Sequence, residues 1–411
     1  MGMEAIREEV MQAVEGLAPE LMAVSRFLHE NPELSFQEFK AKACLSEVLK
    51  RYGFAVEEGI AGLETAFLAS YSPCPSPLRG EGVRRPRPAI AFLAEYDALP
   101  GLGHACGHNL IASSSLGAAL ALKPFVERLG GHILLIGCPA EEKGGGKIPL
   151  IKAGLFDGVD AVLLIHPDNR TIITTRSLAM RRIDVEFFGK AAHAAASPHL
   201  GINALDAVIL SFHNINALRQ HLRPDARVHG IITHGGKAPN IIPDYASAQF
   251  LIRALDLDYL KALHRKVEGC FEGAALTTGA RLELKIEEEY EPLQPNATLS
   301  DLFRRNLEVL GVQIDQEPED QQLGSTDVGY VSRVVPAIQP SIAICKPSVA
   351  CHSPEFAEAA GSEEGHRMML IAAKALALTA LDLFADLEKL EEVKAEWAAA
   401  EDRPYKRGSG W

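Results

Sequence analysis

One stretch of the chain, AIAFLAEYDALPGLGHACGHN at residues 89–109, carries signals for both the architecture and a candidate site. It opens with a short, continuously apolar run and passes into a loop with acidic, histidine and cysteine side chains. Apolar runs of this length are typical of strands that are buried on both faces of a parallel sheet. Ligands of open α/β sheets bind beyond the carboxyl ends of the strands, so we expect chemistry in the loop that follows the run.

Three further apolar runs follow along the chain, and stretches with helical periodicity separate them. They are HILLIGC (132–138), AVLLI (161–165) and SIAIC (341–345). This pattern predicts an α/β fold with a mostly parallel sheet covered by helices. Two helices are predicted before the sheet, over residues 3–28 and 36–51, and Ser35 and Glu38 stand at the spacing of a capping box for the second.

The pattern changes between residues 179 and 293, where strands and two longer amphipathic helices follow in the order βαββαβ. This order is typical of a four-stranded antiparallel sheet with helices on one face. We therefore predict a main domain made of residues 1–178 and 294–411, interrupted by an inserted module at residues 179–293.

The composition of the 411-residue chain is that of a globular protein, with 47% hydrophobic residues and a formal net charge of −13. No run of Lys or Arg marks a nucleic-acid surface, so no nucleic-acid partner is expected. The N-terminal sequence is acidic and amphipathic, unlike a secretion signal, and no apolar stretch reaches the roughly 18 residues of a membrane span. We expect a cytoplasmic protein with no membrane partner.

Neither the cysteine count nor the proline-rich segment predicts a site by itself. The seven cysteines are odd in number and scattered, which argues against a disulfide framework. Residues 71–88 are rich in proline, glycine and arginine and lack apolar periodicity. We interpret this segment as a mobile surface insertion.

All four predicted strands are followed by side chains that bind metals or transfer protons. They are Cys106 and His108 after the first run, Glu141 and Glu142 after the second, His166 after the third and His352 after the last. Since the carboxyl ends of parallel strands meet at one edge of a sheet, we expect one thiol, three imidazoles and two carboxylates to converge there.

A thiolate with imidazoles and a carboxylate suits zinc or a neighbouring divalent ion, and five ligands are more than one tetrahedral site needs. We therefore expect two divalent metal ions. A water between ions about 3.5–4 Å apart becomes a nucleophile near neutral pH, and a nearby carboxylate must accept its proton. Two adjacent glutamates in irregular chain point in different directions, so we assign Glu142 as a ligand and Glu141 as the general base. The pattern thus predicts a two-metal hydrolase.

Two other hypotheses explain part of the same pattern. Cys106 with His108 could form a thiol nucleophile and its base, although this leaves the glutamates and the other histidines without a shared task. A non-catalytic protein could bind a small amino-acid conjugate or hold metal as a folding staple, but it would need no free base. Metal-activated water is the hypothesis that uses all of these side chains.

Two more residues of the first loop are candidates for supporting roles. Asp97 could orient a ligand histidine, or it could cap a turn. His104 could support the site or belong to the turn alone. The sequence leaves these alternatives open.

These residues lie in motifs through which the chain resembles the M20 metallopeptidases, specifically their amidohydrolase branch. The motifs span nearly the whole chain: HENPELSFQE (29–38), AEYDALPGLGHACGHN (94–109), PAEEKGGG (139–146), IHP (165–167), GKAAHAAASPHLGINALDA (189–207), APNIIPD (238–244), GSTDVG (324–329) and CHSPEF (351–356). Within the branch, AEYDALPG and GSTDVG are most similar to dipeptidase and p-aminobenzoyl-glutamate hydrolase members.

The resemblance implies a small amide substrate, either a dipeptide or an N-acyl amino acid, and two divalent ions, zinc or manganese. The implied ligands are Cys106, His108, Glu142, His166 and His352, with Glu141 as the general base. It also implies that the inserted module is a lid domain through which a homodimer forms. One departure is Asn109, where many relatives have Asp, which puts the charge near His108 in doubt.

The resemblance further assigns roles to three residues of the lid. His193, in GKAAHAA, is implied to help polarise the scissile carbonyl. Asn240, in APNIIPD, is implied to hydrogen-bond the substrate near the same carbonyl. Arg253, in FLIRA, is implied to hold a substrate carboxylate. Without the resemblance, His193 would be a loop residue and Arg253 an ordinary charge near a strand end.

Overall fold

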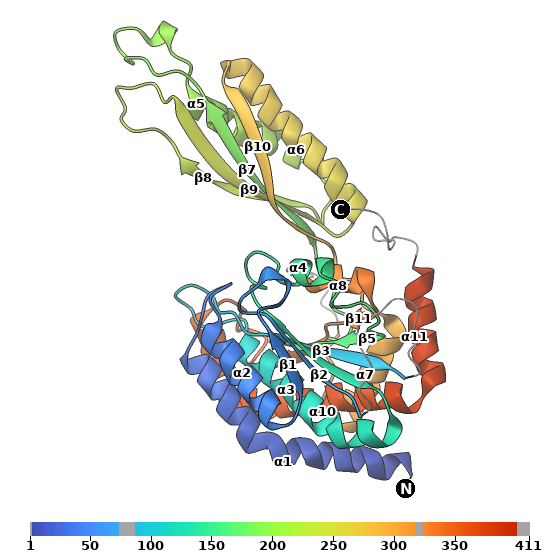
Figure 1. Cartoon of the computed structure of the whole chain (residues 1–411). Helices are drawn as coiled ribbons and strands as arrows, with labels where there is room; N and C mark the ends of the chain where they lie inside the picture. The colour runs from blue at the N-terminus through green and yellow to red at the C-terminus, as the bar shows by residue number, and fades with distance from the viewer. Residues whose placement is uncertain (1, 74–86, 317–323, 401–411) are drawn as a thin grey trace. The chain divides into compact units, whose positions relative to one another are not determined.

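The computed structural model describes residues 2–73, 87–316 and 324–400, and these form two compact units (Figure 1). The first unit contains the chain up to Arg176 and most of the chain from Leu293 onward. The second contains Ser177–Pro292 with residues 324–326. The surface insertion predicted at 71–88 falls almost entirely outside the described residues.

Within its described residues, the first unit is built on a six-stranded sheet in the order β1-β2-β4-β3-β5-β11. The strands are β1 Ala55–Glu58, β2 Phe67–Tyr71, β3 Ala89–Glu95, β4 His132–Cys138, β5 Ala161–Leu163 and β11 Ala337–Ile338. The four strands β4, β3, β5 and β11 are parallel to one another, and β1 and β2 are antiparallel. The predicted fold class, an α/β fold with a mostly parallel sheet, is confirmed.

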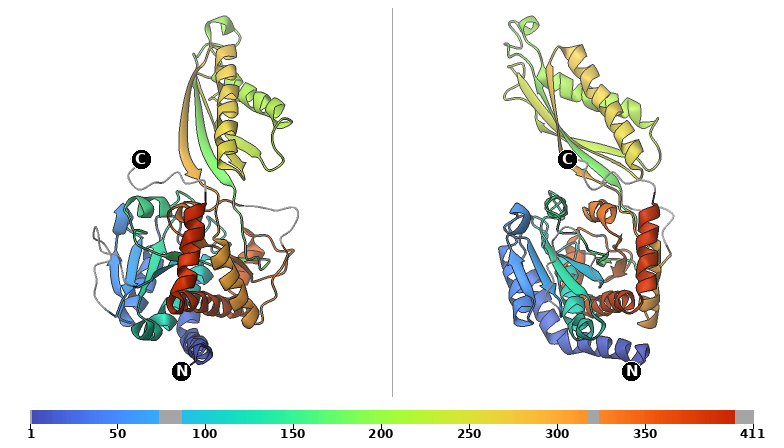
Figure 2. Two further views of the ribbon diagram at one scale, coloured as in Figure 1. Left: turned by 90° about the vertical axis from the view of Figure 1, so that its right-hand side faces the viewer. Right: turned by 45° about the vertical axis from the view of Figure 1, so that its right-hand side comes forward.

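Helices cover both faces of this sheet. They are α1 Met3–Glu30, α2 Phe39–Arg51, α3 His108–Leu129, α4 Lys147–Lys152, α7 Ala297–Val309, α8 Val328–Val334, α9 Pro354–Ala360, α10 Glu363–Ala385 and α11 Leu387–Ala399. Figure 2 shows the long helices α1, α3 and α10 packed together at one side of the unit. Helices α3 and α10 are long and apolar enough to cross a membrane, but 89% and 72% of their most apolar windows are buried inside the protein. They are core helices of this unit.

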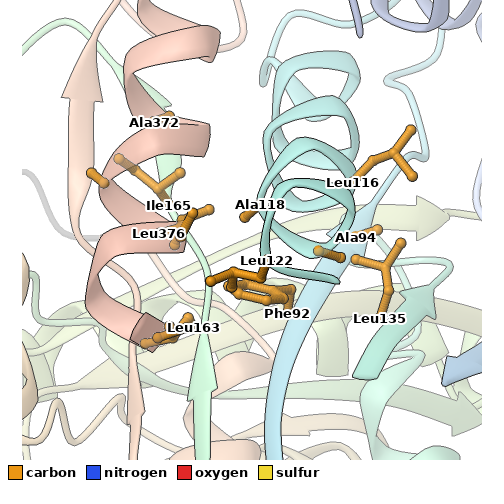
Figure 3. Packing of buried hydrophobic residues seen from close by; sticks show 14 of the residues in the cluster. Phe92, Ala94, Leu116, Ala118, Leu122, Leu135, Leu163, Ile165, Ala372 and Leu376 are labelled. Atoms are coloured by element: carbon orange, nitrogen blue, oxygen red, sulfur yellow. The ribbon is translucent and has the colours of Figure 1, made fainter. Parts of the chain in front are cut away.

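The central strand β3 is buried on both faces because alternate side chains enter different apolar clusters. Phe92 and Ala94 pack with residues of α3 and α10 (Figure 3). Ala91 and Leu93 belong to a second cluster, which includes residues of α4 and α8. Each fully buried Leu or Phe contributes roughly 1.5–3 kcal/mol relative to an exposed one. The strand is therefore held firmly, and so is the start of the loop that follows it.

The run SIAIC does not join the main sheet as predicted. Its first residues form β12 (Ser341–Ala343), which pairs in parallel with β6 (His166–Asp168) in a separate two-stranded sheet. The strand next to β5 is instead the short β11, which precedes the run. An apolar run predicts burial, but hydrogen-bond partners along the chain decide which sheet it enters.

The capping box predicted for Ser35 and Glu38 is also wrong. Helix α2 begins at Phe39, and the carboxylate of Glu33 accepts the amides of Lys40 and Ala41 in the first turn. Ser35 donates its hydroxyl to Asp97, and Glu38 binds two backbone amides outside the helix. Tertiary partners have taken up the side chains that the local spacing assigned to a cap.

The second unit contains a four-stranded antiparallel sheet in the order β10-β7-β9-β8. Its elements in chain order are β7 Ala179–Phe188, α5 Ala204–Arg219, β8 Arg227–His234, β9 Tyr245–Ala254, α6 Leu257–Thr278 and β10 Arg281–Tyr290. Both helices lie on one face of this sheet and pack against each other (Figure 2). Asn203 and Asp256 cap them by accepting amides of their first turns.

Candidate metal centre

Six side chains of the first unit converge in three overlapping groups, in each of which all ligand atoms lie within 4.8 Å of one another. The groups are Cys106, His108 and His166; Cys106, Glu142 and His352; and His108, Glu141 and Glu142. These are the five predicted ligands and the predicted general base. The structure therefore brings together residues that are as much as 246 positions apart in the chain (352 − 106).

The turn between Cys106 and His108 depends on a glycine. Gly107 has φ +77°, and a Cβ there would lie 2.8 Å from the ring of Pro167. This left-handed residue ends the loop and starts α3, so that His108 is the first residue of a buried helix. The two ligand side chains are thereby directed into the same small space from consecutive elements.

Asp97 orients His108. The Nδ1 atom of His108 lies 2.8 Å from the carbonyl oxygen of Asp97 and 3.1 Å from its Oδ1 atom, so Nδ1 carries a proton and donates it. The lone pair of Nε2 is then available to a metal. Among the described residues Nε2 has no hydrogen-bond partner although it is fully buried, and Oε1 of Glu142 is buried without one as well. Orphaned buried polar atoms of this kind fit a bound cation.

Asp97 also holds the glutamate turn in place. Its Oδ2 atom accepts the Ser35 hydroxyl at 2.9 Å and the amide of Glu142 at 3.0 Å. Burial opposes ionisation of Asp97, but the bond and charge of His108 and these two donors outweigh it and lower its pKa to about 2. Of the two alternatives left open by the sequence, the contacts match the one in which Asp97 orients a histidine.

The two glutamates lie in a tight turn directly after β4. Ala140 has φ +59°, and its amide donates to Oε1 of Glu38 at 2.9 Å. Oε1 of Glu142 lies 3.8 Å from Nε2 of His108 and 3.7 Å from Nε2 of His352. Two donors about 2.1 Å from one tetrahedral ion are roughly 3.4 Å apart, so Glu142 stands at a ligand's distance from both imidazoles.

Glu141 has a different environment from its neighbour. Its Oε2 atom lies 3.9 Å from Nε2 of His108, and the side chain is almost completely buried. Burial raises the pKa of Glu141 well above its ordinary value, and the charges of Glu95 and Glu142 raise it further. A carboxylate with a raised pKa is suited to accept a proton from water near neutral pH.

The remaining two histidines come from the small sheet and from the loop before α9. His166 begins β6, and its Nδ1 atom donates to the carbonyl of Pro167 at 2.6 Å, so Nε2 faces Sγ of Cys106 at 3.4 Å. His352 has φ +62°, and its amide donates to the carbonyl of Ala105 at 2.9 Å. Each is thus tied by its backbone or its own ring to a neighbour of the centre.

The environment of Cys106 does not favour a thiol nucleophile. Burial raises the pKa of this thiol well above its ordinary value, and Glu142 and Glu141 raise it further. Nucleophilic cysteines need the opposite shift, from nearby cations or a helix N-terminus. Its hydrogen-bond partner is His166, whereas the hypothesis from the sequence paired it with His108.

The three predicted lid residues all lie in the second unit. His193 and Asn240 are exposed and occupy neighbouring loops, since the amide of Ala194 donates to the carbonyl of Asn240 at 3.0 Å. Nδ1 of His193 accepts the amides of Ala195 and Ala196 at 3.3 and 3.1 Å. Its neutral ring must therefore carry the proton on Nε2, which leaves a hydrogen-bond donor free for another molecule.

Arg253 lies on β9, and its guanidinium is half-buried. Burial lowers the pKa of this group, and its Nε atom makes no hydrogen bond within the described part of the chain. A half-buried guanidinium without a carboxylate partner is suited to binding one from outside.

Two other residues singled out in the sequence have structural partners. His104 is buried, with Nε2 at 3.1 Å from the carbonyl of Leu28. Asn109 is buried and donates from Nδ2 to Ser25 and to the carbonyl of Ala360, at 3.0 and 2.9 Å. An aspartate could not donate to that carbonyl, so the amide at position 109 satisfies this structure.

Sequence reasoning missed several residues around the centre. Ser35 and Glu38 support Asp97 and the glutamate turn, and Glu95, Lys147 and Asp327 form a buried charged cluster beside it. All five lie within or next to the motifs quoted above, and their only signal was a charged or polar residue beside a predicted buried strand or turn.

Comparisons with known proteins agree with this geometry. The profile of Peptidase family M20/M25/M40 matches residues 91–375. The chain is 39% identical over 406 residues to the Xaa-Arg dipeptidase of Mus musculus, with 96% of this chain and 93% of that protein covered. It is 31% identical over 482 residues to a p-aminobenzoyl-glutamate hydrolase of Escherichia coli (strain K12), with 98% and 97% of the two chains covered.

The fold is also similar to that of a solved structure, the YxeP protein of Bacillus subtilis, a dinuclear metal-binding peptidase of the M20 family. The TM-score is 0.66 at 23% identity, with 90% of this chain and 99% of that chain covered. At this level of identity the likeness concerns the fold.

Proposed function

Because this chain belongs to peptidase family M20/M25/M40, we propose that it hydrolyses the amide bond of a dipeptide at a pair of divalent ions, zinc or manganese. The family resemblance stated from the motifs is thereby confirmed, and the chain is a metal-dependent amide hydrolase. The proposed ligands are Cys106, His108, Glu142, His166 and His352. The proposed general base is Glu141.

The observation that carries this proposal is the way the three groups overlap. The group with His166 and the group with His352 have only Cys106 in common. Two ions that share one thiolate ligand would use this arrangement fully, whereas a single ion would leave several of the donors unused. Thiolate and imidazole together favour zinc or a similar first-row ion over magnesium or calcium.

The proposed reaction divides the work between the ions and the chain. Such ions, when bound, supply a water of lowered pKa and polarise the scissile carbonyl. Glu141 takes the proton from the attacking water and delivers it to the leaving nitrogen, so that the amide bond breaks to an amine and a carboxylate. Nε2–H of His193 donates to the oxygen on which negative charge develops, and Asn240 binds the substrate beside it. Arg253 binds the substrate's carboxylate.

The proposed substrate is a dipeptide with a C-terminal basic residue, on the ground of the likeness to the Xaa-Arg dipeptidase. The net charge of −13 is compatible with a cationic substrate. We expect kcat/KM for Xaa-Arg and Xaa-Lys dipeptides to exceed that for Xaa-Glu dipeptides and p-aminobenzoyl-glutamate by about tenfold or more, since one charge contact is worth roughly 1.5–3 kcal/mol. A panel of these compounds, run with zinc, manganese and cobalt, measures this.

The same panel run on Arg253→Met tests the proposed carboxylate contact. KM should rise by about 10- to 100-fold for every substrate with a free carboxylate, with little change in kcat. Arg227→Met is the matched control, because Arg227 lies directly opposite Arg253 on β8 and is exposed. If the protein binds metal and hydrolyses no compound of the panel, the non-catalytic alternative replaces this proposal.

We also propose that two copies associate through β8. This strand is at the edge of the second unit's sheet, and Ile231 and Ile232 on it are 62% and 46% exposed. Exposed edge strands with apolar side chains pair readily with another strand. We expect Ile231→Lys to convert a dimer to a monomer at micromolar concentration in sedimentation experiments.

Leu276→Lys is the control for this experiment. Leu276 is 87% exposed on α6, away from the β8 edge in the order of the sheet, so its substitution should leave the dimer intact. A wild-type protein that sediments as a monomer at every concentration would refute association through β8.

A further inference from the structure

Lys147 is a fully buried lysine that the proposed reaction does not use. Its Nζ atom lies 2.6 Å from Oε1 of Glu95 and 2.5 Å from Oδ1 of Asp327, and none of the three side chains is exposed. A buried ammonium group is costly unless it is paired, and removal of one partner from such a cluster costs roughly 3–5 kcal/mol. The retention of this cluster beside the candidate centre therefore calls for an explanation.

The cluster joins three elements at the end of the glutamate turn. Glu95 is the last residue of β3, Lys147 is the first residue of α4, and Asp327 precedes α8. The amide of Lys147 also donates to Oδ2 of Asp327 at 3.1 Å. Asp327 thus binds both the backbone and the side chain of Lys147.

The turn that carries Glu141 and Glu142 passes directly into Lys147. It closes tightly on itself, because a Cβ on Gly146 would lie 1.9 Å from the carbonyl oxygen of Pro139. Glu38 and Asp97 hold the first half of the turn by its amides, as described above. Lys147 holds the other end.

Glu95 connects Lys147 to the metal-binding atoms. One carboxylate oxygen of Glu95 binds Nζ of Lys147, and the other, Oε2, lies 3.8 Å from Nε2 of His108. Glu95 is thus a third carboxylate close to Glu141 and Glu142, and like charges at this range repel one another. Lys147 supplies the nearby positive charge that offsets this repulsion, and it fixes which oxygen of Glu95 faces His108.

We propose that Lys147 is a positioning residue for hydrolysis, which fixes the glutamate turn and the carboxylate of Glu95 against the metal-binding side chains. This inference rests on the proposed function, because it assigns Lys147 an effect on the same centre. Lys147 touches neither substrate nor metal in this account and acts through Glu95, Asp327 and the turn.

The experiment compares Lys147→Met, Lys147→Arg and Asp327→Asn with the wild type in three measurements. These are zinc affinity by titration against a competing chelator, kcat and KM on the best dipeptide, and thermal unfolding. We expect Lys147→Met to weaken zinc binding by about 10- to 100-fold and to lower kcat with KM changed by less than about threefold. Lys147→Arg should recover part of both losses, and Asp327→Asn should show the same changes in smaller degree.

Arg7→Met is the matched control. Arg7 forms a part-buried ion pair with Asp382 at 2.5 Å in the same unit, between α1 and α10, and it has no contact with the centre. Its loss should lower the unfolding temperature while zinc affinity and kcat stay at wild-type values. A change of zinc affinity in Lys147→Met but not in Arg7→Met separates positioning from general stability.

The proposal is overturned if folded Lys147→Met binds zinc and turns over substrate within about twofold of the wild type. If Lys147→Met does not fold, the same criterion applies to Asp327→Asn, which keeps Lys147 paired with Glu95. If the wild type binds zinc but hydrolyses no dipeptide, the proposed function fails, and the comparison of zinc affinities still decides the role of Lys147.

Discussion

Glu141→Gln is expected to lower kcat by on the order of 10²- to 10⁴-fold, the usual contribution of a general base, while the protein keeps its metal. The substitution preserves shape and hydrogen-bonding capacity but removes the ability to accept a proton from water. Glu141 belongs to only one of the three ligand groups, so its loss leaves the Cys106, Glu142 and His352 group and the Cys106, His108 and His166 group complete. Steady-state kinetics with metal analysis of the same preparation measures both effects.

Two variants sharpen this test. Glu142→Gln should reduce bound metal as well as kcat, because Glu142 belongs to two groups and lies between two imidazoles. Glu57→Gln should behave as the wild type, because Glu57 is exposed on β1. Near-normal turnover by metal-loaded Glu141→Gln would remove Glu141 from the role of base, and loss of metal from that variant would make it a ligand.

The convergence of the site could be foreseen because strand order follows from simple patterns. Glu95, at the end of β3, lies opposite Cys138 at the end of β4 in the parallel register. The loops that carry Cys106 and the glutamates therefore start at one edge of the sheet. Continuous apolar runs were enough to predict the buried strands, and ligand-type residues after them were enough to predict where they meet.

The details of the turns could not be foreseen, because they break local preferences. Three of the four non-glycine residues with positive φ in the described chain are at the centre or against it: Phe36, Ala140 and His352. Such conformations cost roughly 1–3 kcal/mol each and persist where the surroundings hold them. Here the amides of Phe36 and Ala140 share Oε1 of Glu38. The apparent capping residue is therefore a support for the glutamate turn.

The buried charged cluster was equally hidden from the sequence. Lys147 follows a glycine-rich stretch, where a lysine normally indicates solvent exposure, and its partners are 52 and 180 positions away (147 − 95 and 327 − 147). Periodicity reports which faces are apolar, and it contains no term for pairing between distant charges. Only the tertiary structure shows that all three groups are buried together.

Removal of metal by a chelator is expected to abolish hydrolysis, and added zinc or manganese should restore it. The reason is that activated water is the only nucleophile that uses all of the converging side chains. Alkylation provides the complementary measurement. Cys106 should react with iodoacetamide slowly in the metal-loaded protein and faster after chelation, because a thiolate held by metal is less available. Peptide mass spectrometry reports this reaction alongside activity.

Cys270 is the internal control for alkylation, because this half-buried thiol lies on α6 in the other unit and should react equally in both forms. The thiol-nucleophile hypothesis predicts the reverse of every result: chelation leaves activity intact, and alkylation of Cys106 destroys it. The structure argues against that outcome, since burial and two glutamates raise the pKa of the thiol and its contact is with His166. Full activity in protein shown to be metal-free would nevertheless transfer the role of nucleophile to Cys106.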